Sequence, residues 1–300
     1  MPEISHSPLV AGVELGGTKC VCILASGPAD VREEVRIATT DPVTTLAGIE
    51  AVLDRWPGIA ALGIASFGPI ELNRAAPDWG HITRTTKPGW SGANIAARLR
   101  DRLQVPVAFE TDVVGAAIGE ARWGAAQGLD GSAYVTVGTG VGVGILSRGV
   151  PLVGFMHGEL GHLRLARAPG DDWPGECPFH GDCVEGLVSG PAIAARTGRR
   201  AETLAASDPA WDAIVHTLGL LIHTLVVTAA PRRIVMGGGV MQQVHLFPRL
   251  RAALAASLGG YVVNAVLDDL DTYIVPPALG ARSGSLGAVA LAQAALHRRD

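Results

Sequence analysis

Apolar residues follow two patterns along this chain, and each pattern predicts a different kind of element. Short apolar runs predict strands near residues 9–15, 20–26, 31–39, 59–65, 106–110, 132–138, 141–147, 233–236 and 272–275. Longer segments with helical spacing predict helices near residues 42–55, 91–103, 113–126, 190–196, 209–229, 246–257 and 284–297. Each half opens with hairpin-like strands and then alternates helices with strands, so we expect mixed sheets covered by helices on both faces.

The two halves repeat one order of elements, which indicates a divergent duplication. A chain of 300 residues suggests about two domains, and the only candidate linker is a broad region from Gly115 to Ala133. We therefore expect an N-terminal α/β domain over residues 1–115 and a larger C-terminal α/β domain over residues 116–300.

A glycine-rich turn joins two apolar strands in each half. The first turn contains Gly16, Gly17 and Thr18, and the second contains Gly138, Thr139 and Gly140. Residues with small side chains let the backbone turn sharply while its N–H groups and a Thr hydroxyl approach a phosphate chain. Either turn alone is also typical of an ordinary hairpin. As a pair, they predict a nucleotide held between two lobes.

The composition favours an enzyme that acts on small molecules. Apolar residues make up 48% of the chain, enough for large cores, and the formal net charge is −4. The basic residues form no long runs, so we expect neither nucleic acid nor an anionic membrane as a partner. The N-terminus has no basic segment leading into an apolar one, so we expect no signal peptide and a cytoplasmic location.

The four cysteines form two pairs with different meanings. Cys20 and Cys22 alternate on one face of a predicted strand and are interpreted as packing residues. Cys177 and Cys183 flank His180 in a glycine- and proline-rich loop that fits neither helix nor strand.

The Cys-x2-His-x2-Cys spacing of this loop supplies three ligands suited to Zn²⁺, and His162 upstream supplies a fourth. Four protein ligands leave no open position for a reactive water, so we expect a structural site that holds the long loop in place. A disulfide between Cys177 and Cys183, or two free thiols, is the alternative reading. A cytosolic chain disfavours the disulfide.

Short motifs are spread over nearly the whole chain. In chain order they are Glu14-x-Gly-Gly-Thr-Lys19, Ser66-Phe-Gly-Pro69, Lys87-Pro-Gly-Trp90, Thr111-Asp-Val113, Gly138-Thr-Gly140, Glu159-x-Gly-His162, the Cys-x2-His-x2-Cys-x-Glu loop and Gly237-Gly-Gly239. This order resembles that of the ROK family of sugar kinases, most closely its zinc-containing bacterial fructokinases. Two features favour that branch: His180 between the cysteines, and the segment around Lys87, in which Thr86 replaces the usual proline.

The resemblance implies an actin-like fold (RNase H-like, hexokinase-like) with two α/β domains around a cleft. It also implies ATP and Mg²⁺ as cofactors, a structural Zn²⁺ and a homodimer. The preferred function is then an ATP-dependent hexose kinase that transfers the γ-phosphoryl group to the 6-hydroxyl of a hexose, with D-fructose as the preferred sugar.

By resemblance, Asp112 is the catalytic base and also contacts the sugar. It follows a predicted strand at the start of a predicted helix, at the carboxyl end of the sheet. On the sequence alone a simple helix N-cap is the favoured reading, and the family pattern reverses that preference. Val114 stands where the family usually carries Asn, so turnover or substrate range can differ while the base remains.

The resemblance assigns the other site residues by group. The sugar-binding residues are Glu159, His162, Gly68, Pro69 and Trp90. The nucleotide-binding residues are Gly16, Gly17, Thr18, Lys19, Gly138, Thr139, Gly140, Gly237, Gly238 and Gly239. The metal ligands are His162, Cys177, His180 and Cys183, and Glu14 is expected to bind Mg²⁺ through water. Three readings stay open: Lys19 as a solvated charge, Trp90 as a packing residue between the lobes, and His157 as a further sugar contact, which is left outside the predicted site.

Other functions are also weighed. Glucose, mannose or N-acetylmannosamine can replace fructose, because no linear motif reveals the shape of the pocket. A sugar-responsive transcriptional regulator needs a helix-turn-helix before the first turn, and only eleven residues precede Gly12. Val114 is the only feature that favours a catalytically weak or silent sugar-binding protein.

Overall fold

The three apolar runs nearest the N-terminus form consecutive antiparallel strands, as the pattern predicts. In the computed structural model, which describes residues 8–297, they build a five-stranded sheet with two further parallel strands. In order across the sheet, the strands are β3 (Asp30–Ala38), β2 (Lys19–Gly27), β1 (Val10–Leu15), β4 (Leu62–Ser66) and β5 (Val107–Thr111). The central strands β1 and β4 are almost wholly buried, which explains their continuous apolar runs.

A second five-stranded sheet repeats this arrangement later in the chain. In order across the sheet, its strands are β8 (Val150–Pro151), β7 (Val141–Ser147), β6 (Gly131–Val137), β9 (Ile234–Gly237) and β10 (Ile274–Val275). In both sheets three consecutive antiparallel strands are extended by two parallel strands beside the first of the three. This shared topology supports the predicted duplication.

All the predicted helices are present, with shifted ends. The α-helices of the described residues are α1 (Pro42–Leu53), α2 (Ala96–Leu103), α3 (Asp112–Trp123), α4 (Val184–Val188), α5 (Gly190–Thr197), α6 (Ala210–Ala229), α7 (Leu246–Leu258), α8 (Leu270–Tyr273) and α9 (Ser283–Ala295). The pattern did not predict α4, α8 or β8, which have two to five residues and so show no clear period. The strand expected over residues 272–275 is only half right, because α8 continues to Tyr273 and β10 comprises Ile274 and Val275 alone.

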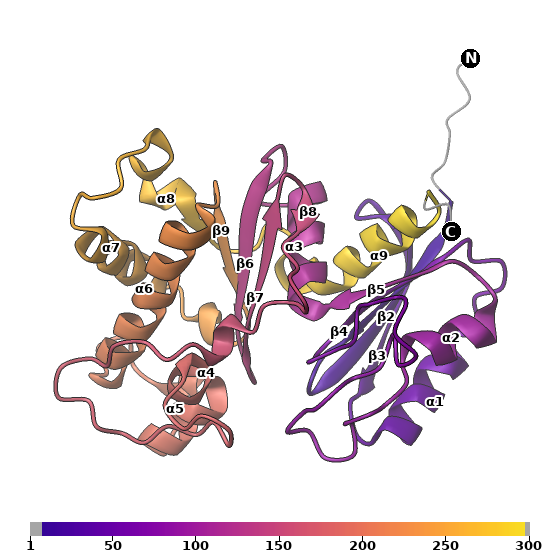
Figure 1. Ribbon diagram of the computed structural model, residues 1–300, viewed down its shortest axis with the longest axis horizontal. Coiled ribbons are helices and arrows are strands. Elements are labelled where there is room, and N and C mark those ends of the chain that lie inside the picture. The colour runs from indigo at the N-terminus through magenta and orange to yellow at the C-terminus, as the bar shows by residue number, and fades with distance from the viewer. Residues whose placement is uncertain (1–7, 298–300) are drawn as a thin grey trace. The chain divides into compact units, whose positions relative to one another are not determined.

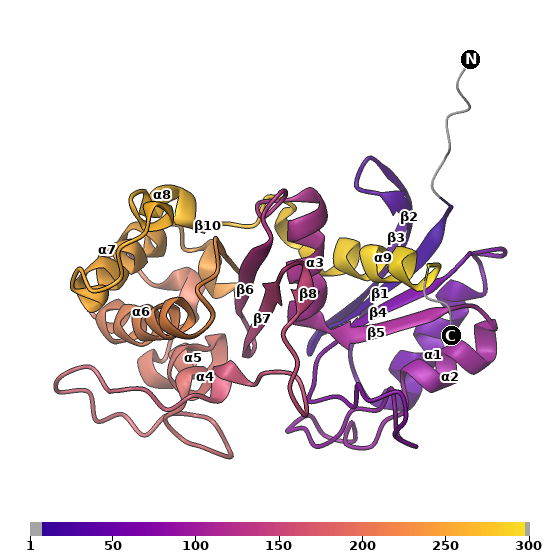
Figure 2. The ribbon, with the colours of Figure 1, turned by 45° about the horizontal axis from the view of Figure 1, so that its top comes forward.

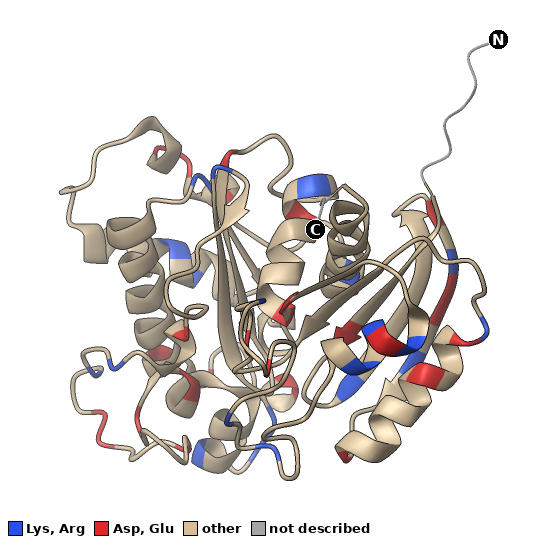
Figure 3. Cartoon of the chain, turned by 45° about the vertical axis from the view of Figure 1, so that its right-hand side comes forward, with Lys and Arg blue, Asp and Glu red and all other residues tan. Residues whose placement is uncertain are grey.

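Helices cover both faces of the first sheet. The buried side of α1 packs on β2 and β3, and α2 packs on β5, while α9 lies along β1 and β4 on the other face and also packs against α3 (Figure 1, Figure 2). Charged pairs join α2 to α1: Arg98 donates to both carboxylate oxygens of Glu50 at 2.6 and 2.9 Å, and Arg102 pairs with Asp54. Basic and acidic residues are interspersed in this part of the molecule (Figure 3).

The close approach of α9 depends on glycine. A Cβ on Gly63 of β4 would lie 1.9 Å from the carbonyl oxygen of Ala288, and a Cβ on Gly287 would lie 1.8 Å from the carbonyl oxygen of Gly115. Any side chain at these positions would collide with backbone. The C-terminal helix is therefore built into the centre of the first sheet's packing.

The chain divides into two compact units. The described part of the first unit comprises residues 8–124, 153–157 and 281–297, and the second comprises residues 125–152 and 158–280. The expected boundary after residue 115 falls inside the continuous helix α3, and α9 belongs to the first unit because it packs on β1 and β4. The outer ends of the two predicted domains, residues 1–7 and 298–300, lie outside the described residues.

The second unit is built around α6. By length and composition this 20-residue helix could cross a membrane, a property that core helices of globular domains share. Its residues Leu218, Leu221, Ile222 and Leu225 are fully buried in the cluster that joins the second sheet to α7. In the structure α6 is thus a core helix.

Candidate active site

The first glycine turn joins β1 to β2. Gly16 N donates to the Lys19 carbonyl at 3.0 Å, and Thr39 holds the turn from outside through its hydroxyl on Gly16 O (2.9 Å) and its N–H on Thr18 O (3.0 Å). A Cβ on Gly17 would meet no atom within 4 Å, and the φ of Gly17 is not positive. Since neither packing nor backbone conformation requires glycine there, the open space suits the close approach of a ligand.

The second glycine turn joins β6 to β7 and is held by α4 and the start of α5. Gly138 N donates to Gly140 O at 2.8 Å, and Gly190 N donates to Gly138 O at 2.7 Å. Glu185 of α4 accepts from the N–H of Val141 at 3.0 Å. The turn is therefore fixed by backbone and by one carboxylate.

The third glycine segment, Gly237 to Gly239, follows β9. Because β6 and β9 are parallel, their carboxyl ends meet at one edge, and a Cβ on Gly138 would lie only 3.7 Å from Gly239 N. Gly238 has a φ of +94°, and a Cβ there would lie 2.4 Å from the carbonyl oxygen of Val137, so this position requires glycine. The two glycine segments of the second unit form one continuous backbone surface.

Asp112 is the first residue of α3, directly after β5. Thr111 is the N-cap, because its hydroxyl accepts from Val114 N at 3.2 Å, so the reading of Asp112 as the cap is wrong. The Asp112 carboxylate accepts from Val113 N at 2.8 Å, and burial raises its pKa to about 6. The backbone thus orients Asp112 without the amide that Val114 replaces.

Glu14 of β1 lies beside this carboxyl group. Burial, and then the charge of Asp112, raise the pKa of Glu14 to about 7. A Cβ on Gly284 of α9 would lie 2.4 Å from the Glu14 carboxyl carbon, so glycine in α9 makes room for it. Glu14 Oε2 is buried and has no hydrogen-bond partner among the described residues. Two neighbouring carboxyl groups with an unsatisfied oxygen form a donor set that fits Mg²⁺.

The predicted sugar loop of the first unit is fixed by a histidine that the sequence analysis left aside. His157 is only 5% exposed, and its Nε2 accepts from Ile70 N at 3.0 Å. Its ring also packs on Gly68, where a Cβ would lie 3.5 Å from the ring. His157 therefore positions the turn that contains Gly68 and Pro69.

Trp90 does not face solvent in the first unit. It is fully buried, packs edge-on against Phe67 with ring centroids 5.1 Å apart, and donates from Nε1 to Thr40 O at 2.7 Å. Its ring acts here as a core residue of the first unit rather than as a cover for a sugar or as packing between lobes.

In the second unit, Glu159 opens a short 3-10 turn, Leu160–His162. His162 N donates to Glu159 O at 3.0 Å, and the Glu159 carboxylate lies 4.0 Å from His162 Nε2. A Cβ on Gly161 would lie 1.9 Å from the Val141 carbonyl, so the turn packs tightly on β7 beside the second glycine turn.

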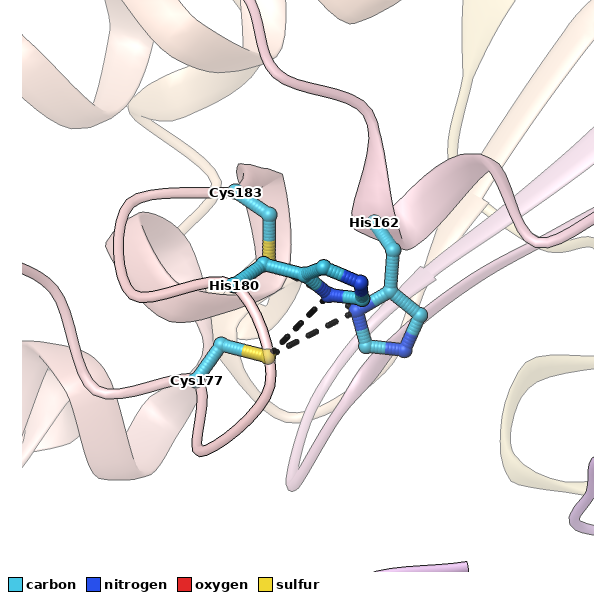
Figure 4. A group of neighbouring side chains, drawn as sticks. All are labelled: His162, Cys177, His180 and Cys183. Carbon is cyan, nitrogen blue, oxygen red and sulfur yellow. Dashed lines mark hydrogen bonds between the residues drawn. The ribbon is translucent and has the colours of Figure 1, made fainter. Parts of the chain in front are cut away.

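The four predicted metal ligands come together (Figure 4). Their ligand atoms all lie within 4.8 Å of one another, and Cys183 Sγ and Cys177 Sγ lie 3.5 and 3.7 Å from His162 Nδ1. His180 Nδ1 lies 3.6 Å from Cys177 Sγ. Sulfur and nitrogen ligands at zinc bond lengths and tetrahedral angles are about 3.6 Å apart, so this cluster fits Zn²⁺.

Without a metal, burial keeps the thiol of Cys183 neutral. Burial, and the neighbouring thiol of Cys177, raise the pKa of Cys183 to about 12. A buried thiol in such a place carries no charge near neutral pH unless a cation holds it as the thiolate.

The interpretation of Cys20 and Cys22 as packing residues is confirmed, because both are fully buried in the core of the first unit.

Each unit thus assembles its own share of the predicted residues. The first unit contains the first glycine turn, Asp112 and the loop of Gly68, and the second contains the other two glycine segments, Glu159 and the metal cluster. The sequence analysis missed the contacts of His157 and Glu185. Only their positions in the sequence could have pointed to them, because His157 stands two residues before Glu159 and Glu185 ends the Cys-x-Glu motif.

Comparisons with known proteins bear on the family and the fold of the chain. The sequence pattern of the ROK family matches residues 10–295. A fructokinase of Pediococcus pentosaceus is 42% identical over 96% of this chain and 99% of that protein, and a fructokinase of Zymomonas mobilis is 40% identical over 94% of this chain and 96% of that protein. The crystal structure of a ROK hexokinase from Thermus thermophilus has a TM-score of 0.76 and 28% identity, over 95% of this chain and 97% of that chain. This likeness and the two mixed sheets confirm the predicted actin-like sugar kinase fold.

The carboxyl pair generates a prediction for the protein without nucleotide or Mg²⁺. Since the pKa values of Glu14 and Asp112 are raised in the folded state, folding binds protons, and unfolding releases them between about pH 4 and pH 7. The free energy of unfolding should therefore be highest at the acidic end of this range and fall as pH rises through about 6 and then about 7. The free energy of unfolding of the Glu14→Gln variant should fall less steeply with pH. Thermal unfolding midpoints measured across this pH range test the difference.

The surface variant Glu202→Gln, which removes an exposed partner of Arg200, is the matched control and should keep the slope of the wild type. Equal slopes for Glu14→Gln and the wild type would show that Glu14 is not protonated in this way.

Proposed function

The chain belongs to the ROK family, and on that premise we propose that it is an ATP-dependent fructokinase, which transfers the γ-phosphoryl group of ATP to the 6-hydroxyl of D-fructose. The observation that carries this proposal is the 35–42% identity to five proteins named as fructokinases, one of them as a putative fructokinase. Relatives named for other sugars, such as a glucokinase at 27% identity, are more distant.

In the proposed reaction Asp112 acts as the general base. Its carboxylate accepts the proton of the C6 hydroxyl as that oxygen bonds to the γ-phosphorus, and ADP leaves with the electrons of the broken bond. A carboxyl with a pKa of about 6 is ionised at neutral pH and remains a stronger base than an ordinary Asp. The bond from Val113 N holds the accepting oxygen in place.

The glycine segments hold the nucleotide in this proposal. The turn from Gly16 to Lys19 binds the terminal phosphates, the turn from Gly138 to Gly140 binds the others, and the backbone of Gly237 to Gly239 accommodates the adenine. Glu14, whose buried Oε2 has no hydrogen-bond partner among the described residues, is the residue that would hold Mg²⁺ through water. When bound, Mg²⁺ neutralises charge on the phosphate oxygens.

Glu159, His162, Gly68 and Pro69 are the proposed sugar contacts, and a carboxylate such as Glu159 can accept hydrogen bonds from two neighbouring hydroxyls. The homodimer and the cytoplasmic location stay predictions.

We also propose that His162, Cys177, His180 and Cys183 hold one structural zinc. Cys183 is the N-cap of α4, and Glu185 in the same helix bonds to Val141 beside the second glycine turn. The metal would therefore support both the turn of Glu159 and the nucleotide side of the second unit.

Metal analysis of the purified protein should find about one zinc per chain, and Cys177→Ser combined with Cys183→Ser should lose both the metal and the activity. The matched control is Cys20→Ala combined with Cys22→Ala, which removes the other two thiols and should keep the zinc. Full activity in metal-free protein would contradict the proposed role.

Asp112→Asn should lower kcat by roughly a hundredfold or more while binding of ATP stays nearly unchanged, because the amide keeps the size of the side chain but cannot accept the proton. Steady-state rates and nucleotide titrations of the variant measure the two effects. Asp101→Asn on the exposed side of α2 is the control. Wild-type turnover in Asp112→Asn would exclude it as the base.

Among hexoses, fructose should have the highest kcat/KM, with glucose and mannose weaker by roughly ten- to a hundredfold, because a sugar with differently placed groups at C1 and C2 leaves buried polar groups unpaired. A coupled assay across fructose, glucose, mannose and N-acetylmannosamine tests this order and identifies the product. A higher kcat/KM for glucose would refute fructose as the substrate while leaving a hexose kinase in place.

A further inference from the structure

Lysine is almost absent from this chain. Only two of its 24 basic residues are lysines, Lys19 and Lys87, and the others are all arginines. Lys19 belongs to the first glycine turn by sequence. Lys87 lies in a different segment of the chain, and neither the sequence analysis nor the proposed reaction gives it a role.

In the structure Lys87 reaches that same turn. Its ammonium nitrogen lies 2.6 Å from Gly17 O and 3.3 Å from Thr39 O, and the side chain is partly buried. Among the described residues its ammonium pairs with no carboxylate, and its hydrogen bonds go to two backbone carbonyl groups.

Together with Thr39, Lys87 occupies the carbonyl groups of Gly16, Gly17 and Thr18. Thr39 bonds to the carbonyls of Gly16 and Thr18, and Lys87 bonds to the carbonyl of Gly17 between them. In a trans peptide the N–H points opposite to the C=O of the same plane. Holding the three carbonyls on one side therefore directs the N–H groups of Gly17, Thr18 and Lys19 to the other side, where Thr18 and Lys19 are exposed.

We propose that Lys87 is a positioning residue of the phosphate site: its ammonium orients the peptide between Gly17 and Thr18 and polarises it, so that the Thr18 N–H becomes a stronger donor to a nucleotide phosphate. Hydrogen bonds in series strengthen one another, and an ammonium at one end of the peptide withdraws electron density from the N–H at the other. The inference rests on the proposed assignment of this turn to nucleotide phosphates.

The geometry also explains why a lysine is used in an arginine-rich chain. One compact ammonium donates to two carbonyl oxygens from a single nitrogen, whereas a planar guanidinium spreads its donors over a wider fork. The segment around Lys87 is itself anchored by the bond of Trp90 Nε1 to Thr40 O, which holds the ammonium at the turn.

The test measures binding of AMPPNP and AMP to the protein with Mg²⁺ and without sugar, by isothermal titration calorimetry. Lys87→Met keeps the length of the side chain and removes its charge and donors, so Kd for AMPPNP should rise about tenfold or more. Kd for AMP, which lacks the two outer phosphates, should change by less than about twofold. Lys87→Arg, which keeps the charge, should recover only part of the affinity for AMPPNP.

Ser91→Ala is the matched control, because it removes a hydrogen bond from Thr85 N within the same segment and should bind AMPPNP as the wild type does. An unchanged Kd for AMPPNP in Lys87→Met, or an equal loss for AMP, would overturn the proposal. Wild-type affinity in Lys87→Arg would overturn the argument for a compact ammonium. If the wild type binds AMPPNP in a Lys87-dependent way but phosphorylates no hexose, the proposed function fails and this inference stands.

Discussion

The close packing of α9 on the first sheet is the constraint on which the rest of the first unit depends. Gly63 and Gly287 let the helix lie directly against backbone, and this distance brings Gly284 onto the carboxyl group of Glu14. Burial follows from that contact and raises the pKa of Glu14, with the charge of Asp112 as the second cause. A helix one side chain further away would reduce the burial of Glu14, which is the main cause of its raised pKa. The protonation of the Glu14 carboxyl group therefore depends on glycines that lie outside the predicted site.

In the second unit, different contacts fix the predicted site residues. Its glycine turn is held by Glu185 and by the start of α5, and both follow directly from the loop that carries the metal cluster. The proposed metal ligands and the second glycine turn are thus linked through α4, although they stand apart in the sequence. A loss of order in the loop would reach the turn through this helix, whose N-cap is the proposed ligand Cys183.

Local patterns explain which features could be predicted. Long apolar runs and helical spacing predicted the strands and the larger helices. The cluster of His162, Cys177, His180 and Cys183 could be predicted because the spacing of its last three members is short and chemically specific. Contacts between distant segments were not predictable: the bond of Ile70 to His157 and that of Lys87 to Gly17 each join residues about 70 or more positions apart. The burial of Trp90 was not predictable either, because an aromatic residue in a motif does not reveal whether its ring faces solvent or core.

The position of α9 also has a consequence for biosynthesis. The first 124 residues of the chain form most of the first unit, yet the helix that covers the centre of its sheet comes from residues 283–295. Until residues 283–295 leave the ribosome, the apolar face of β1 and β4 on which α9 packs lacks that helix. The first unit therefore cannot complete its packing until the second unit's residues 158–280 have already been translated.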